Sequence, residues 1–279
     1  MITATAMLLL AVVAGQGPAA PVEAPLVSIA GAARNLRFDV PFATEDVSAV
    51  FDFAQDRDGA FWLATNNRLI RWDGRSRKIF GPLFFNSVRS TVFNVQADTR
   101  DGVWIGFGGR ASACNDSVPC NQEWPAIPGL ARVVDGKPLP IVHLPDGLDD
   151  NVWALAAQGD VLWIGTGMGV VRRLNGRFTR FGTEAGLADP FVTAIAPLAN
   201  GDVLVGTRAG VQILREGRFG TLNPLGLVRE IVEDTNGTRW IATADGLWRQ
   251  TTRQFATRFG ISDGLPGDSV RGVAVDRQG

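Results

Sequence analysis

The sequence predicts an all-β fold, namely a β-propeller built from four-stranded blades. Two observations support this prediction: a short cassette that recurs along the chain, and turn signals between short apolar strands. The cassette starts with a turn of Asp, Asn and Gly and continues as a bulky strand that ends in a small residue, mostly followed by threonine. Its copies occupy residues 58–65, 101–106, 159–166, 201–207 and 236–243. A motif that recurs in this way indicates a repeat architecture.

The anchor residues of the five copies set the size of the repeat. They are Trp62, Trp104, Trp163, Leu204 and Trp240, spaced 42, 59, 41 and 36 residues apart. Three of these spacings lie close to ~40 residues, the period of a four-stranded propeller blade. The long spacing contains an insertion, Gly108–Pro128. The chain is therefore expected to form about five complete blades.

Each repeat is predicted to contain four strands. The first is an apolar stretch, as at Val152–Ala157, and a turn leads from it into the cassette strand. Gly, Asn and Asp supply the positive φ that tight hairpin turns require. A third strand and a turn such as Asn175-Gly176 follow, and an aromatic fourth strand, most clearly Arg177–Phe181, completes the unit. Outside the N-terminus no apolar pattern has the period of about 3.6 residues that marks a long helix.

The cassette and its flanks resemble the two-component regulator propeller repeat. That repeat typically reads Gly-Leu-Pro, a strand, Asp-x-x-Gly, Trp-Ile-Gly-Thr, Gly-Leu and then Phe-x-x-Tyr or Phe. The best matches are Gly264–Arg271, Asp160–Thr166 and Gly176–Phe181, and the resemblance covers roughly residues 34–279. Leu204 departs from the pattern, and Phe takes the Tyr positions because the chain has no tyrosine.

The resemblance implies a periplasmic sensor region of a bacterial receptor, of the hybrid two-component or diguanylate-cyclase type. The output would be a kinase, a cyclic-dinucleotide enzyme or a transcription factor beyond a membrane span. The expected partners are a ligand, such as a carbohydrate or another nutrient, and a second copy of the receptor. A plain protein-interaction scaffold remains the alternative function, and a propeller lyase is a further one.

Composition limits the classes of protein to consider. With 46% hydrophobic and 20% charged residues in 279, the chain is expected to be globular. The formal net charge is −1. Without a basic patch, nucleic acid and anionic membrane are not expected to be the main partners.

The N-terminus is predicted to direct export. Ala6–Ala14 is an apolar run of the length found in signal peptides and is too short to span a bilayer. We therefore expect a signal peptide at 1–20, a linker at 21–33 and a periplasmic location. No Lys or Arg precedes Arg34, which leaves an apolar tail as the alternative.

The propeller region, residues 34–279, is expected to be incomplete. Gly264–Gly279 matches the inter-blade loop and first strand of a sixth repeat, and Asn35–Asp46 matches a last strand and the loop after it. These partial strands predict an open ring. The hypothesis is that the chain is a fragment of a larger receptor whose output domain lies elsewhere.

The periodic tryptophans and aspartates are interpreted as structural. A tryptophan at the same position in four of the five repeats suits packing between blades, although a sugar-stacking surface is the alternative. The aspartates at Asp58, Asp101, Asp160 and Asp202 suit turns, although a ring of metal ligands is conceivable. No metal or cofactor site is therefore expected.

The insertion Gly108–Pro128 holds the non-periodic candidates. In an oxidising periplasm Cys114 and Cys120 are expected to form a disulfide, with two free thiols as the alternative. Glu123 and Trp124 are not required by the repeat, so they are candidates for a ligand or partner contact.

No catalytic residue is expected. The single histidine, His143, has no visible partner motif, and neither a phosphate-binding loop nor a nucleophile elbow occurs.

Overall fold

The computed structural model describes residues 50–65, 68–80, 91–98, 102–108, 129–145, 151–251, 257–265 and 267–273. The chain divides into two compact units, Glu45–Val192 and Thr193–Gly279, the latter grouped with Met1–Thr44. We call them the first and the second unit. The predicted signal peptide at 1–20, the linker at 21–33 and the partial strand at Asn35–Asp46 lie outside the described residues, as do residues 274–279.

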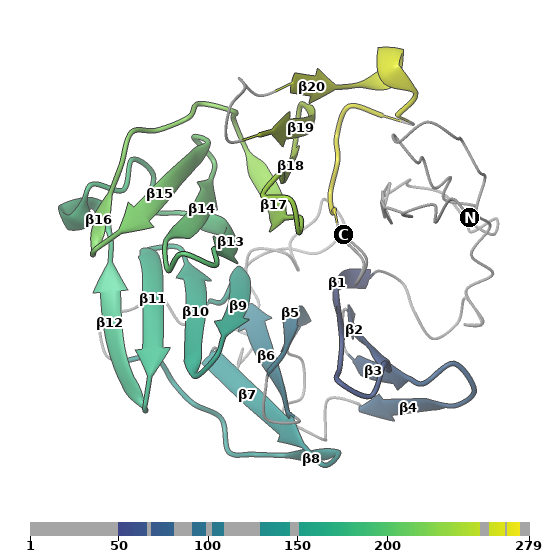
Figure 1. Ribbon diagram of the computed structural model, residues 1–279. Helices are drawn as coiled ribbons and strands as arrows, with labels where there is room; N and C mark the ends of the chain where they lie inside the picture. Colours follow the sequence, from purple (N-terminus) through teal and green to yellow (C-terminus); the bar gives the residue numbers. More distant parts are fainter. Residues whose placement is uncertain are drawn as a thin grey trace, which may run out of the picture. The chain divides into compact units, whose positions relative to one another are not determined.

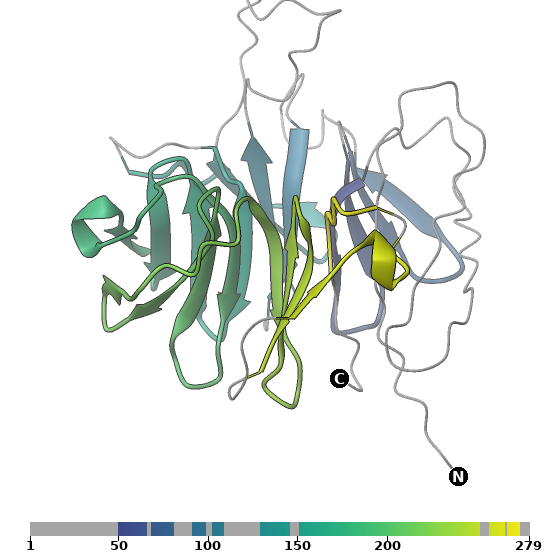
Figure 2. The ribbon, with the colours of Figure 1, turned by 90° about the horizontal axis from the view of Figure 1, so that it is seen from above.

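Within the described residues the fold is all-β, as predicted. Twenty strands form five sheets of four strands each, and within every sheet neighbouring strands follow one another in sequence. Strands pair antiparallel in each of the five sheets. Figures 1 and 2 show the sheets as separate groups of strands, each of which is one blade of a propeller. The prediction of five four-stranded blades is therefore confirmed.

The first unit contains three blades. Blade 1 comprises β1 (Val50–Gln55), β2 (Phe61–Thr65), β3 (Leu69–Trp72) and β4 (Arg77–Phe80). Blade 2 comprises β5 (Thr91–Ala97), β6 (Gly102–Gly108), β7 (Gly129–Val134) and β8 (Lys137–Pro138). Blade 3 comprises β9 (Ala154–Gln158), β10 (Val161–Thr166), β11 (Gly169–Leu174) and β12 (Arg177–Phe181).

The second unit contains blades 4 and 5. The first strand of blade 4 begins at Val192, which is the last residue of the first unit. Blade 4 comprises β13 (Val192–Pro197), β14 (Val203–Thr207), β15 (Val211–Arg215) and β16 (Arg218–Phe219). Blade 5 comprises β17 (Val228–Glu233), β18 (Arg239–Thr243), β19 (Gly246–Gln250) and β20 (Thr257–Phe259). The only helical turns in the described residues are the 3₁₀ turns η2 (Thr183–Ala185) and η3 (Ile261–Asp263). The described residues contain no helix that is long and apolar enough to span a membrane.

The cassette forms the second strand of each blade, and its anchor residue is buried. Trp62, Trp104, Trp163, Leu204 and Trp240 are each at most 8% exposed. In the first unit, Trp62 packs with Val95 and Val103 of blade 2. Trp104 packs in the same way with Leu162 and Ile164 of blade 3. Packing between blades, which the sequence indicated for the tryptophans, is therefore seen for Trp62 and Trp104.

The small residue near the end of the cassette gives room for the next blade. A Cβ atom on Gly106 would lie 2.5 Å from Cγ1 of Val152, and one on Gly206 would lie 2.5 Å from Cγ1 of Val228. Contacts this short do not occur in proteins without a shift of the neighbour, so the glycines set how closely successive blades approach.

An arginine lies directly across the hairpin from the cassette tryptophan in four blades. The pairs are Trp62 with Arg71, Trp104 with Arg132, Trp163 with Arg172, and Trp240 with Arg249. In the first, second and fourth of these, the guanidinium carbon lies 5.8, 5.5 and 5.9 Å from the centroid of the paired indole, a cation–π distance. Blade 4 replaces both members at once, with Leu204 opposite Ile213. The pair is thus a unit of blade packing.

The turn before the cassette is held by the first residue of Asp-x-x-Gly. Asp56 accepts hydrogen bonds from the Ala60 N–H (2.9 Å), the Trp62 indole N–H (2.8 Å) and Nε of Arg71 (3.0 Å). Asp58, which the sequence suggested for this turn, does lie in it, but its side chain is 82% exposed. The structural acceptor is therefore Asp56.

The other aspartates suggested for turns have different environments. Asp202 pairs with Arg215, with Nη2 of the arginine 2.6 Å from Oδ2. Asp160 lies in the turn between β9 and β10, and Asp101 lies outside the described residues. The described residues contain no group of three or more His, Cys, Asp and Glu arranged to hold a metal ion.

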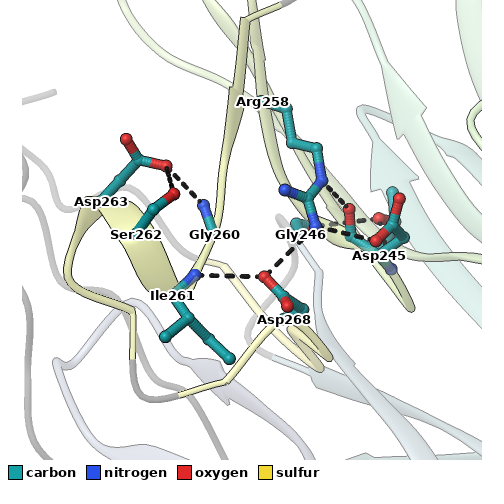
Figure 3. A network of polar contacts seen from close by, with 9 residues as sticks. Asp245, Gly246, Arg258, Gly260, Ile261, Ser262, Asp263 and Asp268 are labelled. Carbon is teal, nitrogen blue, oxygen red and sulfur yellow. Dashed lines mark hydrogen bonds and ion pairs between the residues drawn. The ribbon is translucent and has the colours of Figure 1, made fainter.

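The segment after the fourth strand turns back through η2 or η3 and a left-handed glycine. Gly186 (φ 97°) and Gly264 (φ 99°) end these turns, and the leucines that follow, Leu187 and Leu265, are 3% and 4% exposed. In blade 5 this segment is fixed by Arg258, whose Nη2 contacts Oδ1 of Asp245 (2.8 Å) and Oδ1 of Asp268 (3.2 Å) (Figure 3). The Gly-Leu pairs are thus inter-blade connections, as the sequence indicated.

Candidate functional site

A ladder of aromatic side chains runs across the first strands of the first unit. Phe51 contacts Phe93 with ring centroids 5.1 Å apart, and Phe93 contacts Trp153 at 5.3 Å. Phe191, just before β13, extends the contact series at 5.0 Å from Trp153. The rings are tilted by 40–54° to one another, an arrangement favoured by aromatic quadrupoles. We call these four residues the aromatic ladder.

The backbone explains why these rings point away from the core. Three of them directly follow Val50, Val92 and Val152, and the last two of these valines are almost completely buried. Since successive side chains in a strand point to opposite faces, Phe51 in β1 and Phe93 in β5 point away from the face that the valine before each of them takes, while Trp153 directly precedes β9. In β1 and β5 the register also shifts at this point, between Val50 and Asp52 and between Val92 and Asn94. Such bulges commonly re-aim a side chain near a functional site.

The ladder is open to solvent at one end. Phe51 is 42% exposed, while Phe93, Trp153 and Phe191 are partly buried. The ladder therefore offers solvent an apolar surface in which Phe51 is the most accessible ring. Surfaces of this kind suit ligands that have an apolar face of their own.

Polar groups lie directly beside the rings. Asp52 accepts hydrogen bonds from the N–H of Phe53 (2.7 Å) and the N–H of Val95 (2.9 Å). The Asn94 side-chain amide donates to the backbone carbonyl of Trp153 (3.1 Å). These contacts connect the bulge of blade 1 to blade 2, and blade 2 to the start of blade 3.

The electrostatic environment of Asp52 is unusual. Burial raises the pKa of Asp52 from 3.8 to about 7, although hydrogen bonds from the Val95 and Phe53 N–H groups and the Asn94 amide act in the opposite direction. The carboxyl group therefore changes charge close to neutral pH.

Two buried polar atoms near the ladder lack a hydrogen-bond partner among the described residues. They are the indole Nε1 of Trp153 and Oδ1 of Asn94. Buried polar groups in native proteins are nearly always satisfied, so each such exception calls for an explanation. Trp163 and Trp248 also have a buried indole N–H without a partner among the described residues, so this feature is not confined to the ladder.

The structure does not test the site residues suggested by the sequence. Cys114, Cys120, Glu123 and Trp124 fall within residues 109–128, outside the described residues, so the disulfide and the contact stay predictions. His143 is exposed in the segment that follows β8.

Sequence reasoning missed the ladder although a signal was present. An aromatic residue follows the valine of the first strand in three successive repeats: Phe51, Phe93 and Trp153. The cassette tryptophans form the fixed motif of the repeat, but they are buried in the blades. The functional candidates lie in the strand before the cassette.

The solved structures most like this one include bacterial receptor domains. One is an extracellular domain from B. thetaiotaomicron assigned to the hybrid two-component system BT3049. It is 20% identical to this chain with a TM-score of 0.61, and the match covers 77% of this chain and 31% of that one. Another, from the same organism, is the extracellular domain of BT4673, assigned to a one-component system. It is 21% identical with a TM-score of 0.58, over 76% of this chain and 28% of that one.

The chain has a β-propeller fold. It spans about a third of the length of the two receptor domains, 31% and 28%. Both are extracellular parts of signalling systems, the class of protein that the repeat resembles.

Enzymes share the fold. Virginiamycin B lyase from Staphylococcus aureus is 12% identical with a TM-score of 0.56, and the match covers 77% of this chain and 71% of the lyase. No protein-family model and no curated protein sequence matches the chain.

Proposed function

We propose that this chain is the ligand-sensing propeller of the extracytoplasmic part of a bacterial signal-transduction receptor. The aromatic ladder is the observation that carries the proposal, because its rings contact one another across three blades and Phe51 is open to solvent. The likeness to extracellular receptor domains supports the class of protein, and the predicted export signal supports the location.

The ladder favours a ligand with a flat apolar face and polar edges. A pyranose ring has this character, since its C–H groups pack on aromatic rings while its hydroxyl groups donate and accept hydrogen bonds. In the proposal the sugar ring would pack on Phe51, the most exposed ring of the ladder. A neutral saccharide is thus the ligand class that we propose.

Binding rather than catalysis is the proposed activity at this surface. Two carboxyl groups beside the ladder accept backbone N–H groups: Asp52 from Phe53 and Val95, and Asp189 from Phe191 (2.9 Å). The contact with Val95 joins two blades, which is a structural task.

A signal requires that the ligand distinguish two states of the receptor. A ligand shifts such an equilibrium only by its difference in affinity for the two states. In the proposal those states are two arrangements of paired receptor copies, and the output domain lies outside this chain.

A thermal-shift screen tests the proposal. The panel would pair cyclic neutral sugars with open-chain polyols of similar hydroxyl content, such as glucose with sorbitol. We expect at least one cyclic sugar to raise Tm in a saturable way while its open-chain partner does not, because only the ring offers an apolar face. Equal shifts from both kinds, or no saturable shift from any sugar, would contradict the proposal.

A further inference from the structure

A cleft of about 480 Å³ separates blades 2 and 3 of the first unit. On the blade 2 side it is lined by Asp98, Trp104, Arg132 and Val142, and on the blade 3 side by Leu162 and Arg173. The turn residues Asp98, Asp160 and Asn175 place it where the first strands end. The aromatic ladder lies where those strands begin, so the cleft and the ladder are separate surfaces.

The cleft exists because blade 2 lacks an aromatic residue that other blades have. The fourth strand supplies a phenylalanine beside the cassette tryptophan in three blades, with ring centroids 5.5 Å apart for Trp62–Phe80 and 6.2 Å for both Trp163–Phe181 and Trp240–Phe259. In blade 2 the residue paired at this position is Val142, opposite Leu130. The smaller side chain leaves space beside Trp104.

Blade 3 places a charged residue into that space. Arg173 pairs with Leu162 across β10 and β11, one position after the tryptophan–arginine pair. The same position holds Val133 in blade 2 and Leu214 in blade 4, which are 2% and 3% exposed. An arginine therefore stands where these blades have a buried apolar side chain.

Two guanidinium groups meet over one indole in the cleft. The guanidinium carbon of Arg132 lies 5.5 Å and that of Arg173 lies 5.0 Å from the centroid of the Trp104 ring. Arg132 is neutralised by Asp98, with Nη2 2.6 Å from Oδ2.

Arg173 has no such compensation within the described residues. It forms no ion pair there, with Asp160 or any other carboxylate, and its Nε is buried without a hydrogen-bond partner. Burial, followed by the nearby Arg132 guanidinium, lowers the pKa of Arg173. The positive charge is thus held where its surroundings disfavour it.

We propose that this cleft binds a small ligand through an oxyanion group, a carboxylate, sulfate or phosphate, that contacts Arg173. A planar guanidinium presents paired N–H donors that match two oxygens of such a group. The anion would contact the Arg173 guanidinium where it lines the cleft and would offset the repulsion between the two arginines. The inference stands on the cleft alone and does not depend on ligand binding at the ladder.

Anion titrations test the site. Sodium sulfate, sodium phosphate and sodium acetate are each compared with sodium chloride at equal ionic strength, which distinguishes the three kinds of oxyanion. The readout is intrinsic fluorescence, because Trp104 is in contact with both guanidinium groups. We expect a saturable change with at least one anion. Its apparent Kd should rise at least about tenfold in Arg173→Gln, the equivalent of one charge-assisted hydrogen bond.

Arg177→Gln is the matched control, since it removes one positive charge from an exposed residue of neighbouring β12. We expect it to bind like the wild type. Equal weakening in both variants would show a general charge effect and overturn the proposal, as would unchanged binding in Arg173→Gln or no saturable change with any of the anions.

Val142→Phe separates loss of the site from loss of the fold. It restores the aromatic residue that other blades have, so the cleft should fill while both arginines remain. We expect anion binding to be lost with Tm unchanged or raised. Wild-type affinity in a folded Val142→Phe protein would place the anion elsewhere and overturn the proposal.

Discussion

At the scale of single residues, one carboxylate can hold a whole hairpin. Asp56 accepts a backbone N–H, an indole N–H and a guanidinium N–H, which join a turn, β2 and β3 of blade 1. Asp58, two residues later, is exposed and lies 3.7 Å from Arg71. The position of an aspartate in the turn, rather than its residue type, therefore decides how much it contributes to the stability of the hairpin.

Asp56→Ala should therefore lower the free energy of unfolding by about 2–4 kcal/mol, because it leaves partly buried donors without an acceptor. Asp58→Ala should leave that free energy nearly unchanged. Urea denaturation of the two variants and the wild type measures both effects. Similar losses in the two variants would contradict the role given to Asp56.

Asp52 links stability to pH. Its pKa in the folded protein, about 7, lies above the ordinary 3.8, so the folded state binds the proton more tightly than the unfolded state does. The stability that this provides is complete below the unfolded pKa and is lost as pH rises through about 7. Asp52 should make the protein less stable at about pH 8 than at about pH 5.

Asp52→Asn removes the titration at nearly the same size. The fall in the free energy of unfolding between these two pH values should be smaller in Asp52→Asn than in the wild type. Urea denaturation at both pH values measures the difference. The same fall in both proteins would mean that Asp52 is not the group responsible.

At the scale of elements, the spacing between blades depends on residues without side chains. Gly206 in β14 would place a Cβ 2.5 Å from Cγ1 of Val228 and 3.0 Å from Cβ of Ala194. Both neighbours are at most 3% exposed, so neither can move into solvent.

Gly206→Ala should therefore cost about 1–3 kcal/mol of unfolding free energy through overpacking. Gly267→Ala is the matched control in the same unit, because a Cβ there would meet no atom within 4 Å. Thermal unfolding of both variants checks the prediction. A Gly206→Ala protein as stable as Gly267→Ala would show that blades 4 and 5 are not closely packed at this point.

The repeat made most elements of the fold predictable. A strand, a turn and a buried tryptophan are local properties, and the sequence placed Trp62, Trp163 and Arg177–Phe181 correctly in their strands. The partners of these residues were not predictable, because Arg71 and Arg132 meet tryptophans only once the register of the hairpin is known.

The candidate sites were harder to predict for a related reason. Phe51, Phe93 and Trp153 are 42 and 60 residues apart in sequence, and three-dimensional packing of the blades brings them into one row. The cleft depends on two residues that depart from the repeat, Val142 and Arg173. Neither residue taken alone in the sequence indicates a binding site. Only the structure shows that both lie beside Trp104.

At the scale of the whole molecule, the blades of the first unit carry two surfaces at different ends of their strands. The aromatic ladder lies where β1 and β5 begin, and the cleft lies near the turns that follow β5 and β9. The ladder thus comes from a residue that recurs in successive blades, and the cleft comes from residues that depart from the repeat.

The central claim is that the aromatic ladder binds a ligand. Isothermal titration calorimetry with neutral cyclic sugars tests it most directly, using the wild type, Phe51→Ala/Phe93→Ala, and Ile79→Ala. Ile79 is the matched control, since it is 38% exposed in β4 and apart from the ladder. The account predicts that a sugar binds the wild type and Ile79→Ala equally and binds the ladder variant about tenfold more weakly, from the loss of two ring contacts. Equal affinity for all three proteins, or no binding of any sugar, would contradict it.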